Sequence, residues 1–359
     1  MKKTKKLVSF ILVFAMAIGI ATCTQAASRE EIANIHVSKA GDFKYWADNS
    51  PAKQTLVNYV KDVTNKKSAN FIPVEDRIAV FDLDGTLICE TTPSYFEWMM
   101  YLDRVLDDPT YNASQEDKDY AKVVKAAIDA RHLPEDMELK EAIAQSKAFA
   151  GMTFPEYENY VKKFMETPAE GLTNLKRGES FYLPMVEVVS YLQANDFTVY
   201  IVSGSDRPAL RILVDSIMKI APNNVIGTDA DILASHQNGK DGLDYVYAKD
   251  DQIIRGEFLR KNVKMNKVSN IAQEIGKQPV LAFGNSSGDA SMFQYTIINN
   301  KYKSAAFTLL CDDLDRELGN QKKADSMAKS AKENGWVAIS MKNDFKTIYG
   351  PEVKRAAAQ

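Results

Sequence analysis

The stretch Ile78-Ala-Val-Phe-Asp-Leu-Asp-Gly-Thr-Leu87 joins four apolar residues to two closely spaced aspartates and a flexible Gly-Thr step. An apolar run without polar alternation is typical of a strand buried on both faces, as in parallel sheets that helices cover. Ligands of such sheets bind beyond the carboxyl ends of the strands, which is where Asp82 lies. Asp82 and Asp84 repel each other unless a cation lies between them. The stretch therefore predicts a hard divalent metal ion with oxygen ligands, with Mg²⁺ as the natural candidate.

Two other structures share part of this pattern. Asp84-Gly85 is a common β-hairpin turn, but residues 91–102 (T-T-P-S-Y-F-E-W-M-M-Y-L) are typical of a helix rather than a returning strand. An EF-hand calcium loop also begins with Asp-x-Asp. Here, however, Leu87 occupies the sixth position, which needs Gly, and Pro93 occupies the twelfth, which needs Glu.

The chain has 359 residues, 45% of them hydrophobic and 26% charged, which suits one large or two modest domains with a real core. At the N-terminus a basic segment precedes about 15 apolar residues, a length that is short for a membrane span and typical of a secretory signal. We expect residues 1–26 to be a signal peptide cleaved near Ala26 or Ala27, with lipid anchoring through Cys23 as the alternative. The mature protein is then exported, secreted or periplasmic, and has no membrane span.

Loss of the four lysines in this segment changes the formal net charge from −3 to about −7, which argues against a nucleic-acid partner. Cys89 and Cys311 remain after cleavage; we expect ordinary part-buried thiols, and whether they pair stays open. Histidines 36, 132 and 236 lack metal-ligand spacing. No feature of the sequence predicts the oligomeric state.

After the first strand the pattern changes to helices. Apolar residues from Tyr120 to Ile128 recur at i, i+3, i+4, i+7 and i+8, and Thr153 with Glu156 predicts a capped helix start. We predict a helical cap domain at 91–178, inserted into an α/β core made of 27–90 and 179–359. Its aromatic residues are candidates for a pocket wall, although we expect core packing for most of them: Tyr95, Phe96, Trp98, Tyr101, Phe154, Tyr157 and Tyr160.

Further apolar segments predict strands at 198–202, 280–283, 305–310 and 336–340, each with helical sequence nearby. The strand at 198–202 ends at Ser203. We expect Asp206 to be the N-cap of a helix to about Ile220, whose free N–H groups favour an anion. The strand at 280–283 leads to Asn285 and Asp289. A doubly wound, Rossmann-like parallel sheet brings these strand ends and Asp82 to one crevice.

Two regions carry weaker signals. Short strands are expected between Val225 and Tyr247 as a hairpin flap without chemistry, and Asn238-Gly239 is its turn signal. The usual interpretation of a basic run is a solvated face, and one precedes the helix predicted at 268–275: Arg260, Lys261, Lys264 and Lys267.

The order F-D-L-D-G-T (81–86), I-V-S-G-S (201–205), a later lysine and A-F-G-N-S-S-G-D (282–289) resembles the four motifs of the haloacid dehalogenase (HAD) superfamily. The resemblance is to its phosphatases with a helical cap, including phosphoserine-phosphatase-like members. It covers the chain from about Ile78 to Met292, and residues 266–289 also look like an exported branch of such phosphatases.

The resemblance implies Mg²⁺-dependent hydrolysis of a small phosphorylated metabolite through an aspartyl-phosphate. By position, Asp82 is the nucleophile and a metal ligand, and Asp84 is the acid and base whose main-chain carbonyl binds the metal. Ser203 holds the transferred phosphoryl group beside Gly204. Glu90, just after the first motif, is a further candidate for binding substrate.

The later motifs supply the remaining roles. Lys267 balances the charge on nucleophile and phosphate, although Lys264 is close enough in sequence to be the motif lysine instead. Asp289 binds or orients the metal. Asn285 stands where many of these phosphatases have an acid, so we expect it to give a weaker metal site.

Other functions stay open at this point. A dehalogenase needs neither the metal nor a second acid, so Asp84 and Asp289 count against it. A phosphotransferase using the same intermediate, or a metal- and phosphate-binding protein without turnover, remains an alternative. The substrate does not follow from the sequence, and phosphoserine, phosphocholine and sugar phosphates all fit.

Overall fold

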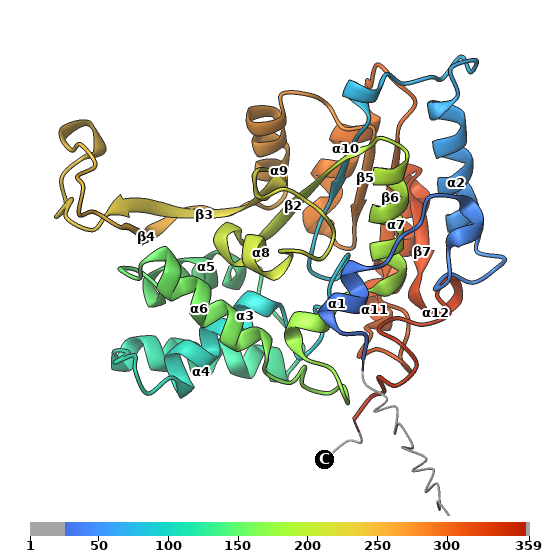
Figure 1. Ribbon diagram of the computed structural model, residues 1–359. Helices are drawn as coiled ribbons and strands as arrows, with labels where there is room; N and C mark the ends of the chain where they lie inside the picture. The colour runs from blue at the N-terminus through green and yellow to red at the C-terminus, as the bar shows by residue number, and fades with distance from the viewer. Residues whose placement is uncertain (1–25, 357–359) are drawn as a thin grey trace, which may run out of the picture.

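The computed structural model describes residues 26–356. Nearly all of the predicted signal peptide, including Cys23, lies outside the described residues. The described chain forms one seven-stranded sheet with helices on both sides (Figure 1). Its strands are β1 (Ile78–Phe81), β2 (Thr198–Asp206), β3 (Val225–Ala234), β4 (Ile253–Arg260), β5 (Leu281–Gly284), β6 (Ala305–Leu310) and β7 (Val337–Ser340).

The strands lie in the order β4-β3-β2-β1-β5-β6-β7, with β1 at the centre. Every neighbouring pair is parallel except β3 with β4. Parallel neighbours need long crossovers, and these place helices on both faces of the sheet. This is a doubly wound, Rossmann-like α/β sheet, and the predicted fold class is confirmed.

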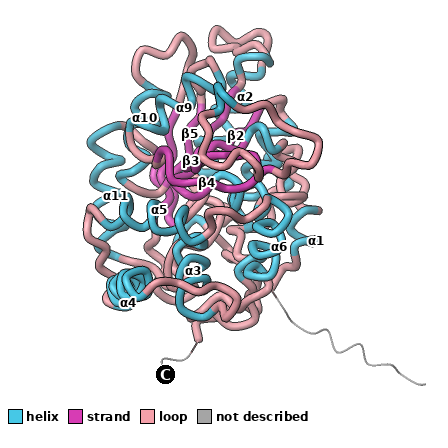
Figure 2. The backbone as a smooth tube through the Cα atoms, turned by 90° about the vertical axis from the view of Figure 1, so that its left-hand side faces the viewer, coloured by secondary structure: helices cyan, strands magenta, loops and turns pink. Residues whose placement is uncertain are grey.

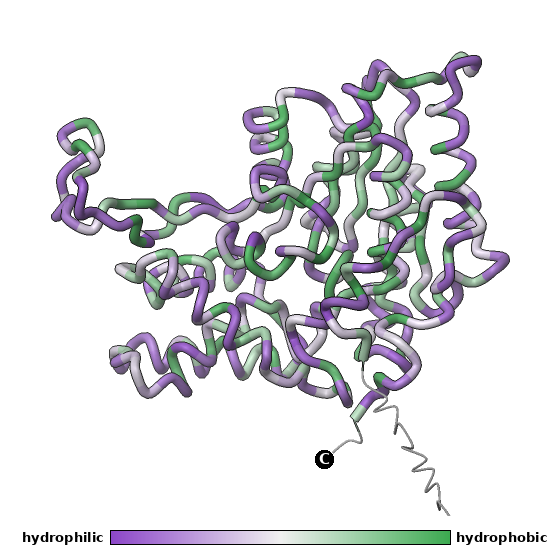
Figure 3. Tube along the Cα trace, in the orientation of Figure 1, coloured by the Kyte–Doolittle hydropathy of each residue, from purple (hydrophilic) through white to green (hydrophobic). Residues whose placement is uncertain are grey.

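Alternate side chains of β1 enter two different cores. Ala79 and Phe81 belong to one buried cluster, whereas Ile78 and Val80 belong to the other. A strand that is buried on both faces needs apolar residues at every position, which explains its unbroken apolar sequence. Figure 3 shows hydrophobic segments along the central strands, where both cores meet.

The helices divide between these two cores. Helices α2 (Pro51–Thr64) and α7 (Leu183–Ala194) contribute to the first cluster, and α10 (Ala290–Ile297) and α11 (Gln321–Asn334) contribute to the second. The remaining core helices are α1 (Arg29–Ala33), α8 (Arg207–Leu213), α9 (Met265–Asn270) and α12 (Met341–Asp344). No helix in residues 26–356 is both long and apolar enough to span a membrane.

Four helices follow β1 and gather at the carboxyl ends of the central strands (Figure 1). They are α3 (Phe96–Leu102), α4 (Gln115–Asp129), α5 (Met137–Ala148) and α6 (Phe154–Met165). Thr153 and Glu156 form the expected capping box of α6. Strands β3 and β4 pass over α3 and α5 (Figure 2). They are joined to this group by hydrogen bonds from Gly151 N–H to Arg255 O and from Arg255 N–H to Met152 O.

Several predicted boundaries were wrong. The second strand continues to Asp206, and the following helix ends at Leu213 rather than near Ile220. The hairpin exists, but its second strand is β4, beyond the predicted Val225–Tyr247 range. The helix predicted at 268–275 begins at Met265 and turns into a π-helical segment at Ile271. The limits of the cap domain at 91–178 stay a prediction.

Candidate active site

Polar side chains converge where β1, β2 and β5 end. Asp82 follows β1, and its N–H donates to the Phe283 carbonyl of β5 at 2.8 Å. Ser203 and Ser205 lie in the last part of β2, and Asn285 follows β5 directly. The parallel register of these three strands explains why residues far apart in sequence meet here.

Lys267 joins the two aspartates of the site. Its Nζ lies 2.7 Å from Oδ1 of Asp82 and 2.6 Å from Oδ1 of Asp289, and all three side chains are buried. Two short bonds to one nitrogen hold the carboxylates close enough to share a ligand. Lys264 lines a neighbouring cavity instead, so the geometry selects Lys267 as the motif lysine.

The charges of this triad do not balance. Burial raises the pKa of the Asp82 carboxyl, Asp289 raises it further, and Lys267 acts in the opposite direction. Burial alone would lower the pKa of Lys267, but Asp289 and Asp82 raise it, so the lysine is charged. With one ammonium group between two buried carboxyl groups, ionisation of both aspartates needs further positive charge, which a bound cation would supply.

The donor atoms also suit a hard divalent ion such as Mg²⁺. Among residues 26–356, no three His, Cys, Asp or Glu side chains are arranged as a metal site. In the predicted ligand set, only Asp82 and Asp289 bind the metal through carboxylates. The main-chain carbonyl of Asp84 and the amide oxygen of Asn285 are the other two ligands. The structure brings these four residues to one cavity.

Asp84 is held by one of its two oxygens. Oδ2 accepts hydrogen bonds from the hydroxyls of Ser205 at 2.7 Å and Ser203 at 3.4 Å. Oδ1 is buried and has no partner within the described residues. Burial raises the pKa of Asp84, and the Ser205 bond only partly opposes this. A carboxyl with a raised pKa and one oxygen without a partner at the wall of a cavity is suited to act as a general acid.

The turn after Asp84 depends on Gly85. Its φ is +75°, and a Cβ at this position would meet Nδ2 of Asn285 at 1.8 Å and Cδ of Glu90 at 2.5 Å. This nitrogen of Asn285 is buried without a partner in the described chain. Glycine therefore lets the first and last motifs approach each other closely.

Asp289 is fixed from both sides. Its Oδ2 accepts hydrogen bonds from the N–H groups of Asn285 and Ser286 at 3.0 and 3.1 Å, while Oδ1 contacts Lys267. Such bonds orient the carboxylate without consuming all of its lone pairs. They explain why the loop carries a run of small residues, Gly284 to Gly288, around one acid.

A second ion-pair network supports the end of β2, and sequence reasoning missed it. Asp206 accepts from Arg255 at 2.7 Å and from the Tyr157 hydroxyl at 2.8 Å, and its N–H donates to Glu97 at 2.6 Å. Glu97 also pairs with Lys261 at 3.1 Å. The sequence did contain one signal for this network, because Glu97 is an acidic residue between apolar neighbours at the second position of α3.

This network corrects two predictions. Lys261 and Lys267 are buried, so the basic run from Arg260 to Lys267 is not a solvated face. Asp206 does cap α8 by accepting from Ala209 N–H at 3.1 Å, but that cap already occupies the helix start at which we expected an anion.

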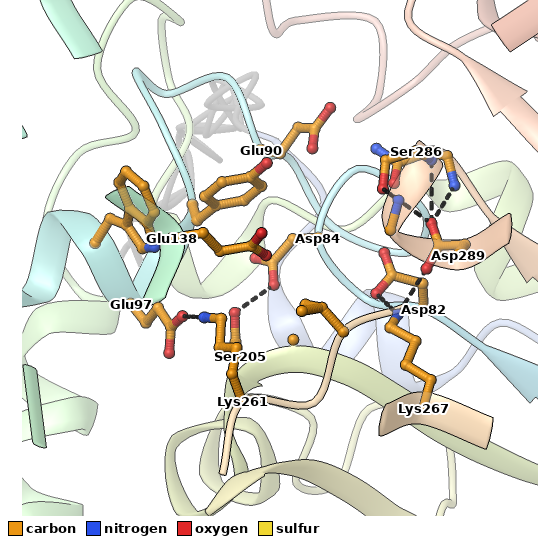
Figure 4. A pocket seen from close by; sticks show the side chains of 16 residues that line it. Asp82, Asp84, Glu90, Glu97, Glu138, Ser205, Lys261, Lys267, Ser286 and Asp289 are labelled. Atoms are coloured by element: carbon orange, nitrogen blue, oxygen red, sulfur yellow. Dashed lines mark hydrogen bonds and ion pairs between the residues drawn. The ribbon is translucent and has the colours of Figure 1, made fainter. Parts of the chain in front are cut away.

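The residues of the site line one cavity of about 60 Å³ (Figure 4). Of the predicted residues, its walls include Asp82, Asp84, Glu90, Gly204, Lys267, Asn285 and Asp289. Ser203 is fully buried beside Asp84, whereas Ser205, which was not predicted, lines the cavity. Of the aromatic candidates, Tyr95 and Trp98 form part of the wall. The thiols of Cys89 and Cys311 are free and buried.

The fold and site together define an α/β protein whose active centre is built from aspartates and a lysine beyond the central strand. Residues 79–294 match the family model of haloacid dehalogenase-like hydrolases. This is more than half of the chain, so the chain belongs to the HAD family of hydrolases. The predicted family and the prediction of a HAD-type enzyme are confirmed.

Similar solved structures are distant in sequence. A conserved, functionally unknown protein from Anaerococcus prevotii is 14% identical, with a TM-score of 0.50, over 85% of this chain and 96% of that chain. Cytosolic 5'-nucleotidase IIIB bound to cytidine is 11% identical, with a TM-score of 0.49, over 81% of this chain and 87% of that chain. At such identities the likeness concerns the fold alone. No curated protein sequence matches the chain.

Proposed function

We propose that this protein is a Mg²⁺-dependent phosphate-monoester hydrolase that acts on a small phosphorylated metabolite outside the cytoplasm. One observation carries the proposal: Lys267 holds Asp82 and Asp289 together in the cavity into which Asp84 presents a free, buried oxygen. The export sequence at the N-terminus supports the location. Helices α3 to α6 serve as the cap over the site.

The reaction follows from these positions. An oxygen of Asp82 attacks phosphorus, the bond from phosphorus to the leaving oxygen breaks, and Asp84 gives that oxygen a proton. Water then attacks the phosphorus of the aspartyl-phosphate, Asp84 takes a proton from it, and inorganic phosphate leaves with the Asp82 carboxylate restored. Splitting the displacement in this way lets each carboxyl perform one task.

The approach of a carboxylate to a phosphate dianion needs positive charge. Lys267 supplies one charge from within the protein. Asp82, Asp289, the main-chain carbonyl of Asp84 and the amide oxygen of Asn285 would hold Mg²⁺. When bound, this ion would neutralise phosphate charge and orient the transferring group. Ser205 keeps Asp84 oriented, and the cap excludes bulk water, which strengthens both electrostatic effects.

Release of inorganic phosphate from a panel of small monoesters tests the function. The wild type, Asp82→Asn and the surface control Asp119→Asn are compared with Mg²⁺ and with chelator. We expect Asp82→Asn to lower kcat/KM by roughly a thousandfold or more, chelator to abolish turnover, and the control to match the wild type. Equal phosphate release by the wild type and Asp82→Asn on every ester, with both folded, would favour a binding protein without turnover.

A further inference from the structure

Beyond the reaction centre the cavity has three more acidic side chains, Glu90, Glu97 and Glu138. Six acidic side chains and two lysines line it. Two of the outer carboxylates are already neutralised, because Glu97 pairs with Lys261 and Glu90 pairs with Lys323. Glu138, from the first turn of α5, has no ion-pair partner within the described residues. The wall therefore holds one half-buried carboxylate without an ion-pair partner in the described chain, and the nearby Lys261 ammonium is already bound to Glu97.

Two aromatic rings line the same part of the wall. Tyr95 and Trp98 stand at the beginning of α3 with their ring centroids 5.5 Å apart and their planes at 69°. Both rings and Glu138 also line an adjoining cavity of about 420 Å³, so they lie where the two spaces meet. Ammonium groups bind over the faces of electron-rich rings, and a carboxylate beside such rings adds an opposite charge.

The unpaired oxygen of Asp84 fixes the direction in which a substrate lies. Asp84 is nine-tenths buried, and its Oδ1 has no partner within residues 26–356. Figure 4 shows the carboxyl groups of Asp84 and Glu138 pointing toward the same space. A leaving oxygen that takes the proton of Asp84 therefore continues toward Glu138 and the rings.

We propose that Glu138, Tyr95 and Trp98 bind a cationic group on the leaving alcohol, so that the substrates are phosphate monoesters of amino alcohols. This inference rests on the proposed phosphatase function. The bond from phosphorus to the alcohol oxygen breaks, Asp84 protonates that oxygen, and the amino alcohol departs with its ammonium group unchanged. The same surplus of negative charge disfavours leaving groups that carry only a carboxylate.

A matched pair of esters separates charge from shape. Phosphocholine and 3,3-dimethylbutyl phosphate differ by a quaternary nitrogen in place of a carbon, and p-nitrophenyl phosphate reports hydrolysis without either group. We expect the wild type to favour phosphocholine over its neutral isostere by about tenfold or more in kcat/KM, mainly through KM. Phosphoethanolamine against propyl phosphate repeats the comparison for a primary ammonium.

Variants assign the preference to Glu138. Glu138→Gln should bring the ratio of kcat/KM between the charged and neutral esters close to one, and Glu138→Asp should retain part of it. Glu116→Gln removes the same charge from an exposed position on α4 and controls for net charge. This variant should keep the wild-type ratio. Calorimetric titration with choline gives a readout without turnover, and we expect weaker binding to Glu138→Gln than to the wild type.

The outcomes separate the two proposals. Hydrolysis of the neutral and aryl esters without a preference for the charged ones overturns the inference and leaves the phosphatase function standing. An unchanged ratio in Glu138→Gln also overturns it. Failure to hydrolyse any ester overturns the proposed function, and this inference with it.

Discussion

Ser205 donates a 2.7 Å hydrogen bond to Oδ2 of Asp84, while Oδ1 of the same carboxyl is buried without a partner in the described chain. This arrangement orients the acid toward the leaving oxygen. We predict that Ser205→Ala lowers kcat/KM, which reports the first phosphoryl transfer, by about tenfold on alkyl phosphates, which need a proton on the leaving oxygen. The loss should be much smaller on p-nitrophenyl phosphate, whose leaving group departs as an anion. Equal losses on both esters would contradict the assignment of Asp84 as the acid.

Lys267 compensates two buried carboxylates, so its removal affects stability as well as turnover. We predict that Lys267→Ala lowers the free energy of unfolding by about 3–5 kcal/mol. Mg²⁺ should restore part of that loss, because it supplies positive charge to the same oxygens. Denaturant unfolding with and without Mg²⁺ measures both effects. Lys264→Ala is the control and should change the free energy of unfolding by less than about 0.5 kcal/mol.

Gly85 and Gly151 allow steric conflict to be separated from backbone strain. Both have positive φ, +75° and +80°, but a Cβ on Gly85 would meet Asn285 at 1.8 Å whereas a Cβ on Gly151 meets nothing within 4 Å. We predict that Gly151→Ala costs about 1 kcal/mol of stability with normal turnover, and that Gly85→Ala abolishes phosphate release. Thermal unfolding and activity assays on both variants check this. Normal turnover in Gly85→Ala would show that the two motifs need not approach so closely.

Glu187 on α7 gives the protein a pH-dependent contribution to stability. Burial raises its pKa from 4.5 to about 7, although the N–H groups of Lys44 and Tyr45 donate to it at 2.6 and 3.1 Å. The folded state binds this proton more tightly than the unfolded state. The contribution is therefore present below about pH 4.5 and is lost as pH rises through about 7.

The variant Glu187→Gln isolates this contribution. The free energy of unfolding of the wild type minus that of Glu187→Gln should fall by up to about 3 kcal/mol between pH 4.5 and 8. Urea unfolding at several pH values measures the difference, and the same titration of Glu158→Gln, an exposed residue of α6, should show no such trend. A difference independent of pH would mean that Glu187 is already ionised in the folded state.

Those parts of the site that follow apolar strands were predictable from the sequence. Asp82 and Asn285 directly follow such strands, and the rule that ligands bind at strand ends was enough to place them together. Lys267 was identified only through the resemblance to a family, because a lysine within a basic run gives no sign that it is buried. The choice between Lys267 and Lys264 needed coordinates, since both precede or begin the same helix.

The contributions of the helices that follow β1 could not be predicted in this way. Glu138 and Glu97 lie on helices whose orientation depends on tertiary packing, and acidic residues are common on exposed helix faces. Ser205 was passed over because the predicted strand ended at Val202, whereas pairing with β3 resumes at Asp206. The strand propensity of residues 203–206 does not show that β3 lies beside them.

The bond between Lys267 and Asp82 joins residues 185 positions apart. The central strand is made first, yet its partner β2 is synthesised only after the helical insertion, and its partner β5 only after the hairpin as well. The reaction centre therefore assembles late, when contacts of long sequence separation close. Recovery of catalysis during refolding should lag behind recovery of helical content, so turnover serves as a natural reporter of the final tertiary docking step.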